Sequence, residues 1–348
     1  MNHNILIICS TNTDYMPYLK NYTKILDERE IEYDLLVWNR MHLEETNSAY
    51  EFKDEKKSVR RNFLDYYKFY VFIKSVLKQS KYEKIIIFGI QMMFFCQRLL
   101  IEYYAQRYLF DIRDYHILAR VTDLKRVIRN AKFTVISSPG YRCFLPSGFD
   151  YIVNHNSNIV AEDLFCRTAI DFGSKYITYM GALRDLEINK KLIVSLADSY
   201  YEAYFAGESD YTKELKDFVK EGRYNVKFTG RYKKEEEKDI YEQTLLVNVL
   251  RYADSLNNKI ALPNRLYNAP LYMKPLLSYK GTYLSDLTKK YKLGLVLNDF
   301  SNLNESIEEY IKMFDFKVYL EGRNCFLKKV IEDNLVFKQA LLEFCKNS

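Results

Sequence analysis

The sequence of 348 residues predicts an α/β protein built from two doubly wound domains, each with a parallel sheet. Its length exceeds what one ordinary hydrophobic core organises, so two domains are expected. Short apolar runs recur along the chain, and longer segments with helical periodicity separate them. The runs are continuously apolar, which is typical of parallel strands covered by helices on both faces. Two such series in tandem predict two α/β domains.

The predicted strands form two series. Those of the first half lie at residues 4–10, 33–38, 84–90, 108–113, 133–138 and 151–154, and those of the second half at 176–183, 202–207, 226–230, 245–250, 274–279 and 294–297. A stretch of mixed polarity precedes the second series. We therefore expect a first domain over residues 1–160, a second over 161–320, and a closing helical segment over 321–348.

Composition excludes several classes of protein. No run reaches the roughly 18 apolar residues that span a bilayer, and the first residues lack the basic start of a signal peptide. The six cysteines lie far apart without a CxxC pair, which argues against a zinc site and against a disulfide framework. We expect a cytoplasmic protein.

The motifs that the sequence lacks narrow its function further. No GxGxxG follows the first predicted strand, and neither GxxxxGK[ST] nor GxSxG occurs. A classical dinucleotide fold, a P-loop NTPase and a hydrolase with a nucleophile elbow are therefore not indicated. No Asp-x-Asp follows a predicted strand, so we expect neither a metal nor a cofactor.

Candidate site residues are sought just after the strands, because the carboxyl ends of parallel strands face the ligand in this class of fold. In the second half, MGALRD ends a strand with Gly181 and places Arg184 just beyond it. An arginine there either binds a diphosphate through paired hydrogen bonds or caps a helix at the surface. KFTGRY ends another strand at Gly230, where bare backbone can approach a base or a ribose.

A third stretch, PNRLYNAPLYMKP at 263–275, predicts a short helix that Pro270 stops. Asn264 is expected to cap this helix with its side chain. The remaining N–H groups of the first turn, with Arg265 beside them, would then form an anion site. Asn268 lies one turn further along the same face.

These three stretches, GALR (181–184), FTGRY (228–232) and PNRLYN…MKP (263–275), resemble the C-terminal domain of GT-B glycosyltransferases. The resemblance is greatest to the family 4-like enzymes of bacterial capsule and surface-polysaccharide synthesis. FDIRDYH (110–116), VISSPGYRCFLP (135–146) and VNHN (153–156) resemble stretches of the same group, so the likeness runs through most of the chain. It implies a GT-B fold, in which two Rossmann-like domains face a central cleft.

The resemblance implies that a nucleotide diphosphate-sugar is the donor and that the second domain binds it. The diphosphate would meet Arg184 and the helix start at Asn264 and Arg265, and the base would lie near Arg231 and Tyr232. In the family a glutamate holds the ribose hydroxyls at the position of Asn268. The implied donor-binding residues are Gly181, Arg184, Arg231, Tyr232, Asn264, Arg265 and Asn268.

The first domain would hold the acceptor, a saccharide on a lipid carrier. FDIRDYHILAR brings Asp111, Asp114 and His116 into one strand-to-helix turn, where two carboxylates and an imidazole can share proton transfer. The alternative is an Asp/Arg ion-pair network that only holds the loop. The implied acceptor-side residues are Ser10, Thr11 and Arg113.

The positive charge of the chain is concentrated in residues 53–84, which carry ten Lys/Arg against four Asp/Glu. FLDYYKFYVFIKSVL within this segment predicts a helix with a wide apolar face. Either the helix lies on an anionic membrane surface, with Lys56, Lys57, Arg60 and Arg61 as a basic patch, or it is a core helix with solvated lysines. No nucleic-acid-binding module accompanies the charge, so nucleic acid is not an expected partner.

We therefore expect a metal-independent glycosyltransferase of the hexosyl type that acts at the inner face of the cell membrane, and the resemblance implies retention of anomeric configuration. Two alternatives stay open. One is a nucleotide-sugar 2-epimerase on the same fold. The other is a catalytically silent partner subunit that has lost its hold on the donor, an alternative that the neutral Asn268 keeps open.

Overall fold

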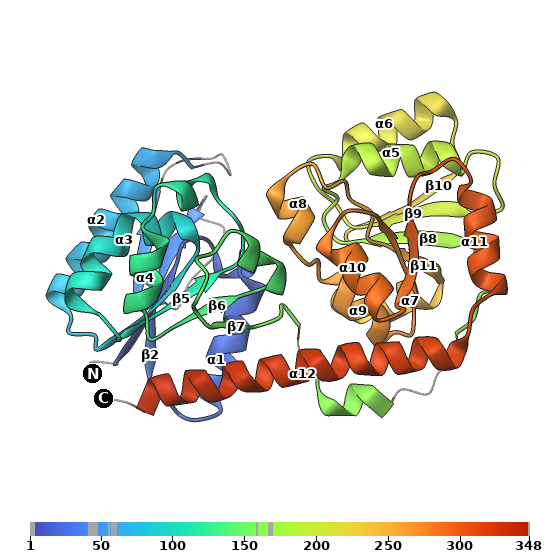
Figure 1. Cartoon of the computed structure of the whole chain (residues 1–348). Coiled ribbons are helices and arrows are strands. Elements are labelled where there is room, and N and C mark those ends of the chain that lie inside the picture. Colours follow the sequence, from blue (N-terminus) through green and yellow to red (C-terminus); the bar gives the residue numbers. More distant parts are fainter. Residues whose placement is uncertain are drawn as a thin grey trace. The chain divides into compact units, whose positions relative to one another are not determined.

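The computed structural model describes residues 4–40, 48–54, 56, 61–157, 159–165 and 170–346, which form two compact units. Unit 1 comprises Met1–Asn158 and Glu332–Ser348, and unit 2 comprises Ile159–Ile331. Each unit is a parallel sheet covered by helices (Figure 1). The predicted class, two doubly wound α/β domains, is confirmed. Lys57 and Arg60 of the predicted basic patch lie outside the described residues.

The sheet of unit 1 has the strand order β3-β2-β1-β4-β5-β6-β7, and all its neighbouring strands are parallel. Its central strands are buried on both faces, as their continuous apolar sequence predicts. The strands are β1 (Ile5–Cys9), β2 (Tyr33–Asn39), β3 (Tyr50–Lys53), β4 (Lys84–Phe88), β5 (Tyr108–Ile112), β6 (Phe133–Ile136) and β7 (Tyr151–Val153).

Helices pack on both faces of this sheet. One face carries α1 (Lys20–Asp27) and the last turns of α12 (Phe316–Lys346), which contribute Tyr22 and Phe337 to a shared apolar core. Trp38 lies on the opposite face of the sheet. The centre of its ring is 4.8 Å from the centre of the Phe69 ring in α2 (Phe63–Gln79). The remaining helices of unit 1 are α3 (Ile90–Tyr103) and α4 (Leu124–Asn130).

The sheet of unit 2 has the order β10-β9-β8-β11-β12-β13, again with every pair parallel. Its strands are β8 (Tyr176–Met180), β9 (Glu202–Ala206), β10 (Val226–Gly230), β11 (Thr244–Asn248), β12 (Leu276–Tyr279) and β13 (Gly294–Leu297).

Two apolar cores cover the two faces of this second sheet. The first core packs Leu192, Leu215 and Ile307 against the sheet, from α5 (Leu186–Ser195), α6 (Thr212–Gly222) and α11 (Leu303–Lys312). The second core includes Leu266 and Leu327, from α9 (Arg265–Leu271) and the first half of α12. The other helices of this unit are α7 (Glu237–Glu242), α8 (Leu256–Ile260) and α10 (Tyr283–Lys290).

The structure contains a strand at each of the twelve predicted positions and one more, β3. The sequence of β3 is Tyr-Glu-Phe-Lys, in which charged residues alternate with aromatic ones. Such alternation suits an edge strand, and β3 lies at the edge of its sheet. A search for continuous apolar runs therefore misses it.

The predicted short helix is present as α9, and Pro270 lies in its last turn. Its early end leaves backbone carbonyls that need donors. The fully buried Arg323 of α12 supplies one, because its Nε donates to the carbonyl oxygen of Pro270 at 2.7 Å. The same guanidinium donates through Nη2 to the carbonyl oxygen of Asp163 at 2.7 Å. The helix end is thus fixed by a buried arginine from far along the chain.

Candidate functional site

Three glycines stand at the carboxyl ends of the neighbouring strands β8, β9 and β10. Gly181, Gly207 and Gly230 have φ angles of 102°, 127° and 75°, which non-glycine residues rarely adopt. A Cβ on Gly207 would lie 2.2 Å from the carbonyl oxygen of Gly181, so no side chain fits there. The glycines therefore leave bare backbone along this edge of the unit 2 sheet.

Arg265 is buried at the same edge, although it belongs to α9. Its guanidinium carbon lies 3.5 Å from the centre of the Tyr179 ring, and Nη1 donates to the carbonyl oxygen of Asn248 at 2.6 Å. Asn248 is itself tied to Asn189 by an amide hydrogen bond of 2.8 Å. These contacts hold the guanidinium rigidly at the ends of β8 and β11.

Arg251 adds a second, largely buried guanidinium to this edge. Its Nη2 lies 4.0 Å from Oδ2 of Asp185. Burial lowers the pKa of Arg251; the charge of Asp185 opposes this effect, and the charges of Arg265 and Arg184 add to it. The positive charges of Arg184 and Arg265 therefore both act on Arg251, an arrangement that a bound anion would stabilise.

Two buried polar atoms of this cluster have no hydrogen-bond partner in the described part of the chain. They are Nε of Arg251 and Oδ2 of Asp185. Buried donors and acceptors without partners cost free energy and are uncommon in native structures. Sequence reasoning missed Arg251, although its position directly after a predicted strand was the available signal.

A polar hollow of about 600 Å³ adjoins the cluster. Its polar lining consists of the exposed Arg184, the carboxylates of Asp185, Glu187 and Asp254, the amide of Asn258 and the hydroxyls of Tyr211 and Tyr252. A cation beside carboxylates, an amide and an aromatic ring can bind a phosphate and hydroxyl groups together. Of the predicted donor-binding residues, the structure thus brings Gly181, Arg184 and Arg265 to one edge of the sheet.

Two other predicted residues differ from expectation in detail. Asn264 occupies the position before α9, but its side chain makes no capping hydrogen bond, because its backbone is already helical. The expectation of a side-chain cap is therefore wrong. Arg231 does not join the arginine cluster: its side chain is 88% exposed and pairs with Glu208 at 3.2 Å.

Asn268 donates a hydrogen bond from Nδ2 to Oε1 of Glu237 in α7, over 2.9 Å. Glu237 is a second residue that sequence reasoning missed, since nothing in the spacing joins α7 to α9. Tyr232 lies near both helices. Burial and the charge of Glu237 raise the pKa of Tyr232 to about 12, and the charge of Arg265 opposes them.

In unit 1 the predicted Asp111 and Arg113 form a buried ion pair. Nη2 of Arg113 donates to Oδ2 of Asp111 at 2.5 Å, and the hydroxyl of Tyr22 donates to the same oxygen. Arg113 also donates to the side-chain oxygen of Asn154 at 2.8 Å. Burial raises the pKa of Asp111, while the charge of Arg113 opposes the shift. The observed contacts of this pair are those of the ion-pair alternative.

The other two predicted proton-transfer residues lie beyond this pair. Asp114 is exposed. His116 is half-buried, and its Nδ1 accepts a hydrogen bond from the backbone N–H of Leu118 at 3.3 Å, which caps a short 3-10 helix, Ile117–Arg120. Burial lowers the pKa of His116, so the neutral form that can accept this bond is favoured near neutral pH.

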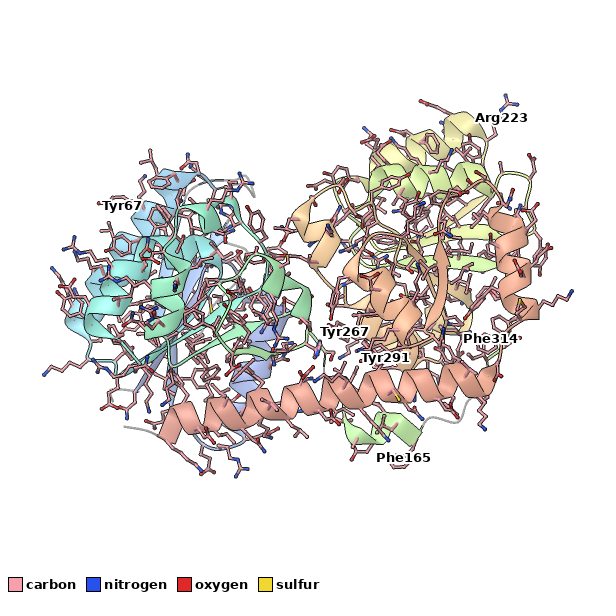
Figure 2. All side chains as sticks on the ribbon, viewed as in Figure 1. Tyr67, Phe165, Arg223, Tyr267, Tyr291 and Phe314 are labelled. Carbon is pink, nitrogen blue, oxygen red and sulfur yellow. The ribbon has the colours of Figure 1, made fainter. Side chains whose placement is uncertain are left out.

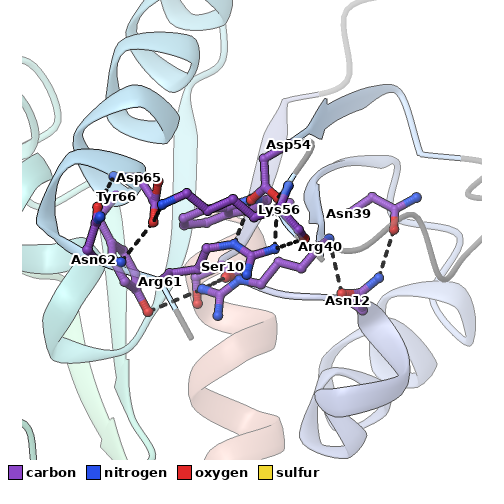
Figure 3. A network of polar contacts seen from close by, with 11 residues as sticks. Ser10, Asn12, Asn39, Arg40, Asp54, Lys56, Arg61, Asn62, Asp65 and Tyr66 are labelled. Atoms are coloured by element: carbon purple, nitrogen blue, oxygen red, sulfur yellow. Dashed lines mark hydrogen bonds and ion pairs between the residues drawn. The ribbon is translucent and has the colours of Figure 1, made fainter. Parts of the chain in front are cut away.

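Polar contacts tie the start of α2 to the carboxyl ends of β1, β2 and β3 (Figure 3). Arg61, whose side chain is fully buried, pairs with Asp54 at 2.6 Å, and Lys56 pairs with Asp65 at 2.6 Å. The two described residues of the predicted basic patch are therefore matched to carboxylates. Arg61 has no exposed side-chain surface to offer a membrane.

The predicted acceptor-side residues Ser10 and Thr11 lie at the same edge and are half-buried. The carbonyl oxygen of Ser10 accepts a hydrogen bond from Nη2 of Arg40 at 2.5 Å. The guanidinium of Arg40 stacks 4.3 Å above the ring of Trp38.

The described residues hold neither a metal-binding cluster nor a helix that could cross a membrane. No three His, Cys, Asp or Glu side chains of residues 4–40, 48–54, 56, 61–157, 159–165 and 170–346 gather as a metal-binding group. Within the same ranges, every helix is too short or too polar to cross a membrane.

Comparison with known proteins gives likeness in structure alone. No family model and no curated protein matches the chain. Sucrose-phosphate synthase of Thermosynechococcus elongatus is similar over 99% of both chains, with 13% identity and a TM-score of 0.68. Anabaena HepE, solved with UDP and glucose, is similar over 97% of this chain and 99% of its own, with 16% identity and a TM-score of 0.66.

The lipopolysaccharide outer core galactosyltransferase WaaB is similar over 97% of this chain and 99% of its own, with 12% identity and a TM-score of 0.63. Likeness over almost the full length of these chains, together with two all-parallel sheets, decides the fold. The chain has the GT-B fold. The expectation of two Rossmann-like domains is thereby confirmed.

Proposed function

We propose that the chain is a glycosyltransferase that uses a nucleotide diphosphate-sugar as its donor and binds it through unit 2. The observation that carries this proposal is the cluster of Arg184, Arg251 and Arg265 at the glycine-lined edge of the sheet. Within the cluster, Asp185 is the carboxylate that acts on Arg251, and two buried polar atoms have no hydrogen-bond partner in the described part of the chain. A diphosphate supplies the negative charge and the acceptor oxygens that this cluster lacks.

The cluster suits the chemistry of glycosyl transfer. The bond between the sugar C1 and a diphosphate oxygen breaks, a bond from C1 to an acceptor hydroxyl oxygen forms, and the hydroxyl proton leaves. Negative charge then grows on the diphosphate, where preorganised guanidinium groups stabilise it. In this proposal the arginines take the place of a metal ion. We further propose a hexose as the transferred group, with retention of anomeric configuration, as in the family 4-like enzymes that the sequence resembles.

For the acceptor we propose a lipid-linked saccharide of surface-polysaccharide synthesis, bound by unit 1. Asp114 and His116 are the proposed proton-transfer residues, since their side chains are partly exposed. Asp111 and Arg113 are both buried in their ion pair. Their proposed role is to position the loop that carries Asp114 and His116. Two structurally similar proteins support the proposal: WaaB is described as a lipopolysaccharide outer core galactosyltransferase, and HepE was solved with UDP and glucose.

An anionic membrane at the inner face of the cell is the proposed partner of the exposed face of α2. Phe63, Leu64 and Tyr67 are 56%, 65% and 49% exposed, and Tyr67 projects away from the helix (Figure 2). Lys68 and Lys74 are exposed as well. Apolar side chains flanked by lysines are typical of helices that lie on anionic lipid. In this proposal the exposed face of α2 takes the place of Lys56 and Arg61, whose side chains pair with carboxylates.

Calorimetric titration with UDP, GDP and ADP tests the donor proposal. At least one of these nucleotides should bind the wild-type protein, and Arg184→Ala should weaken that binding by tenfold or more, because hydrogen bonds to charged groups contribute about 1.5–3 kcal/mol. No heat with any nucleotide would favour the silent partner subunit. Unchanged affinity in Arg184→Ala would refute the assignment of the site.

A further inference from the structure

Asp185 carries a buried carboxylate oxygen that lacks a hydrogen-bond donor. Its side chain is 7% exposed, and Oδ2 has no hydrogen-bond partner in the described part of the chain. Nη2 of Arg251 lies 4.0 Å from this oxygen, which is beyond hydrogen-bonding distance. A buried acceptor without a donor costs free energy and is uncommon in native structures. The oxygen therefore indicates that a bound group supplies a hydrogen.

The proposed diphosphate cannot supply this hydrogen. Its ionised oxygens accept hydrogen bonds and donate none, so they can satisfy Nε of Arg251 but not Oδ2 of Asp185. The carboxylate also repels a phosphate, although the charge of Arg251 beside it offsets part of this repulsion. The group that reaches Asp185 must therefore be a hydrogen-bond donor, such as a hydroxyl.

The hollow beside the arginine cluster can hold such a group next to Asp185. Asp185 lines this hollow of about 600 Å³ together with Tyr211, Tyr252 and Asn258. Aromatic rings beside a carboxylate and an amide offer both apolar surface and hydrogen-bonding groups, which suits a hydroxylated ring. Arg184 lines the hollow as well and belongs to the arginine cluster. A ligand that extends from the cluster into the hollow thus joins an anion to a hydroxylated ring.

The other two carboxylates in the lining of the hollow differ from Asp185. Glu187 pairs with Lys190 at 3.2 Å, and Asp254 accepts a hydrogen bond from Nδ2 of Asn258 at 2.9 Å. Both carboxylates are exposed, so water can complete their hydrogen bonding. Of these three, Asp185 is the one whose burial makes it depend on a donor from a ligand.

We propose that Asp185 accepts a hydrogen bond from a hydroxyl group of the transferred sugar and selects donors that carry this hydroxyl. The inference rests on the proposed function, because the sugar of a nucleotide diphosphate-sugar is bonded directly to the diphosphate that the arginines bind. The sugar then lies in the hollow, with the diphosphate at Arg184 and Arg251. Asp185 determines specificity for the sugar and contributes nothing favourable to binding of the diphosphate.

Calorimetry on Asp185→Ala, without an acceptor, tests this role with two ligands. The first is the best-binding nucleotide of UDP, GDP and ADP. The second is its tightest-binding sugar conjugate among those of glucose, galactose, mannose and N-acetylglucosamine. Asp217→Ala is the matched control, because Asp217 is an exposed carboxylate of α6 in the same unit and its loss changes the charge equally.

The two ligands should respond differently to the loss of Asp185. The nucleoside diphosphate should bind Asp185→Ala as tightly as the wild type, or up to about tenfold more tightly, because a negative charge leaves the arginine cluster. The ratio of the Kd for the sugar conjugate to the Kd for the nucleoside diphosphate should rise by about tenfold or more. In the control, both Kd values should stay within about twofold of the wild type.

Deoxy analogues of the same sugar conjugate identify the hydroxyl through a ligand-by-residue cycle. The sugar hydroxyls are removed in turn. Removal of one of them should weaken binding to the wild type by about tenfold or more, and should weaken binding to Asp185→Ala by less than about threefold. If Asp185→Ala fails to fold by circular dichroism, Asp185→Asn replaces it. The Kd ratio should then rise by about threefold or more, because a neutral amide oxygen is a weaker acceptor than a carboxylate.

An unchanged Kd ratio in a folded variant would overturn the inference and leave the proposed function standing. Equal weakening of both ligands is such a result, since it would give Asp185 a purely structural role. A wild-type protein that binds a nucleoside diphosphate but none of the four sugar conjugates would also overturn the inference. A wild-type protein that binds none of the nucleotides would instead overturn the proposed function and this inference with it.

Discussion

Replacing Arg251 by methionine should weaken nucleotide binding strongly, although no motif marks this residue. Methionine keeps a long side chain, so the change removes charge and donors with little loss of volume. The Arg251 side chain is 11% exposed, so a diphosphate beside it would be partly screened from water. Two charges 4 Å apart interact by about 4 kcal/mol at an effective dielectric constant of about 20, which sets a ceiling.

Net values for hydrogen bonds to charged groups are smaller, about 1.5–3 kcal/mol, because binding also removes water from both partners. We therefore expect Arg251→Met to raise the Kd for the nucleoside diphosphate by about 10- to 100-fold. Calorimetry at fixed ionic strength measures this, with Lys259→Gln as control, because Lys259 is an exposed cation in the nearby helix α8. An affinity within twofold of the wild type, in a variant that remains folded, would refute the role of Arg251 in the site.

Two further predictions concern unit 1. Burial alone would raise the pKa of Asp54, but hydrogen bonds from Arg61 and from Trp38 outweigh it and lower the pKa. The stability that this carboxylate contributes is thus present above its unfolded pKa of about 3.9 and is lost as the pH falls through its lower folded value. Asp54→Asn should cost about 3 kcal/mol at pH 7, because it removes the negative charge that pairs with the buried guanidinium of Arg61. The difference in unfolding free energy between the wild type and Asp54→Asn should shrink as the pH falls from 5 toward 2. A difference that stays constant over this range would contradict the stabilising role of the ionised Asp54. Fluorescence of Trp38, the single tryptophan, follows the unfolding. Replacing Lys68, Lys74 and Lys78 of α2 by glutamine should weaken binding to anionic vesicles about 100-fold at low salt, at about 1 kcal/mol per lysine. The same change at Lys213, Lys216 and Lys220 of α6 should leave vesicle binding unchanged. Equal cosedimentation of the two triple variants with vesicles, or no cosedimentation of the wild type, would contradict the membrane proposal.

The sequence predicts the sheets well because their strands are buried on both faces. Continuous apolar runs mark β1, β4 and β11 without ambiguity, since little else produces them in a soluble domain. The edge strand β3 escapes the same rule because its exposed face is charged. The early end of α9 follows from Pro270, but the buried Arg323 that completes it comes from a helix whose packing no local pattern reveals.

The candidate site is predicted less completely than the fold, for a physical reason. Arg184 and Arg265 could be named because each follows a recognisable element, a strand end or a helix start. Arg251 also follows a predicted strand, but no recognisable motif surrounds it, and Glu237 reaches Asn268 only through tertiary packing. Arg61 shows the converse case: its charge suggests a surface patch, yet its side chain is buried against Asp54. Which charges face a ligand depends on partners that lie far away in the sequence.

The central claim, that the three arginines of unit 2 bind the donor diphosphate, is tested most directly by a crystal structure of the chain with a nucleoside diphosphate. The account predicts diphosphate oxygens within hydrogen-bonding distance of the guanidinium groups of Arg184 and Arg251, at the edge formed by Gly181 and Gly207. A nucleotide bound elsewhere, or no bound nucleotide at millimolar concentration, would contradict it.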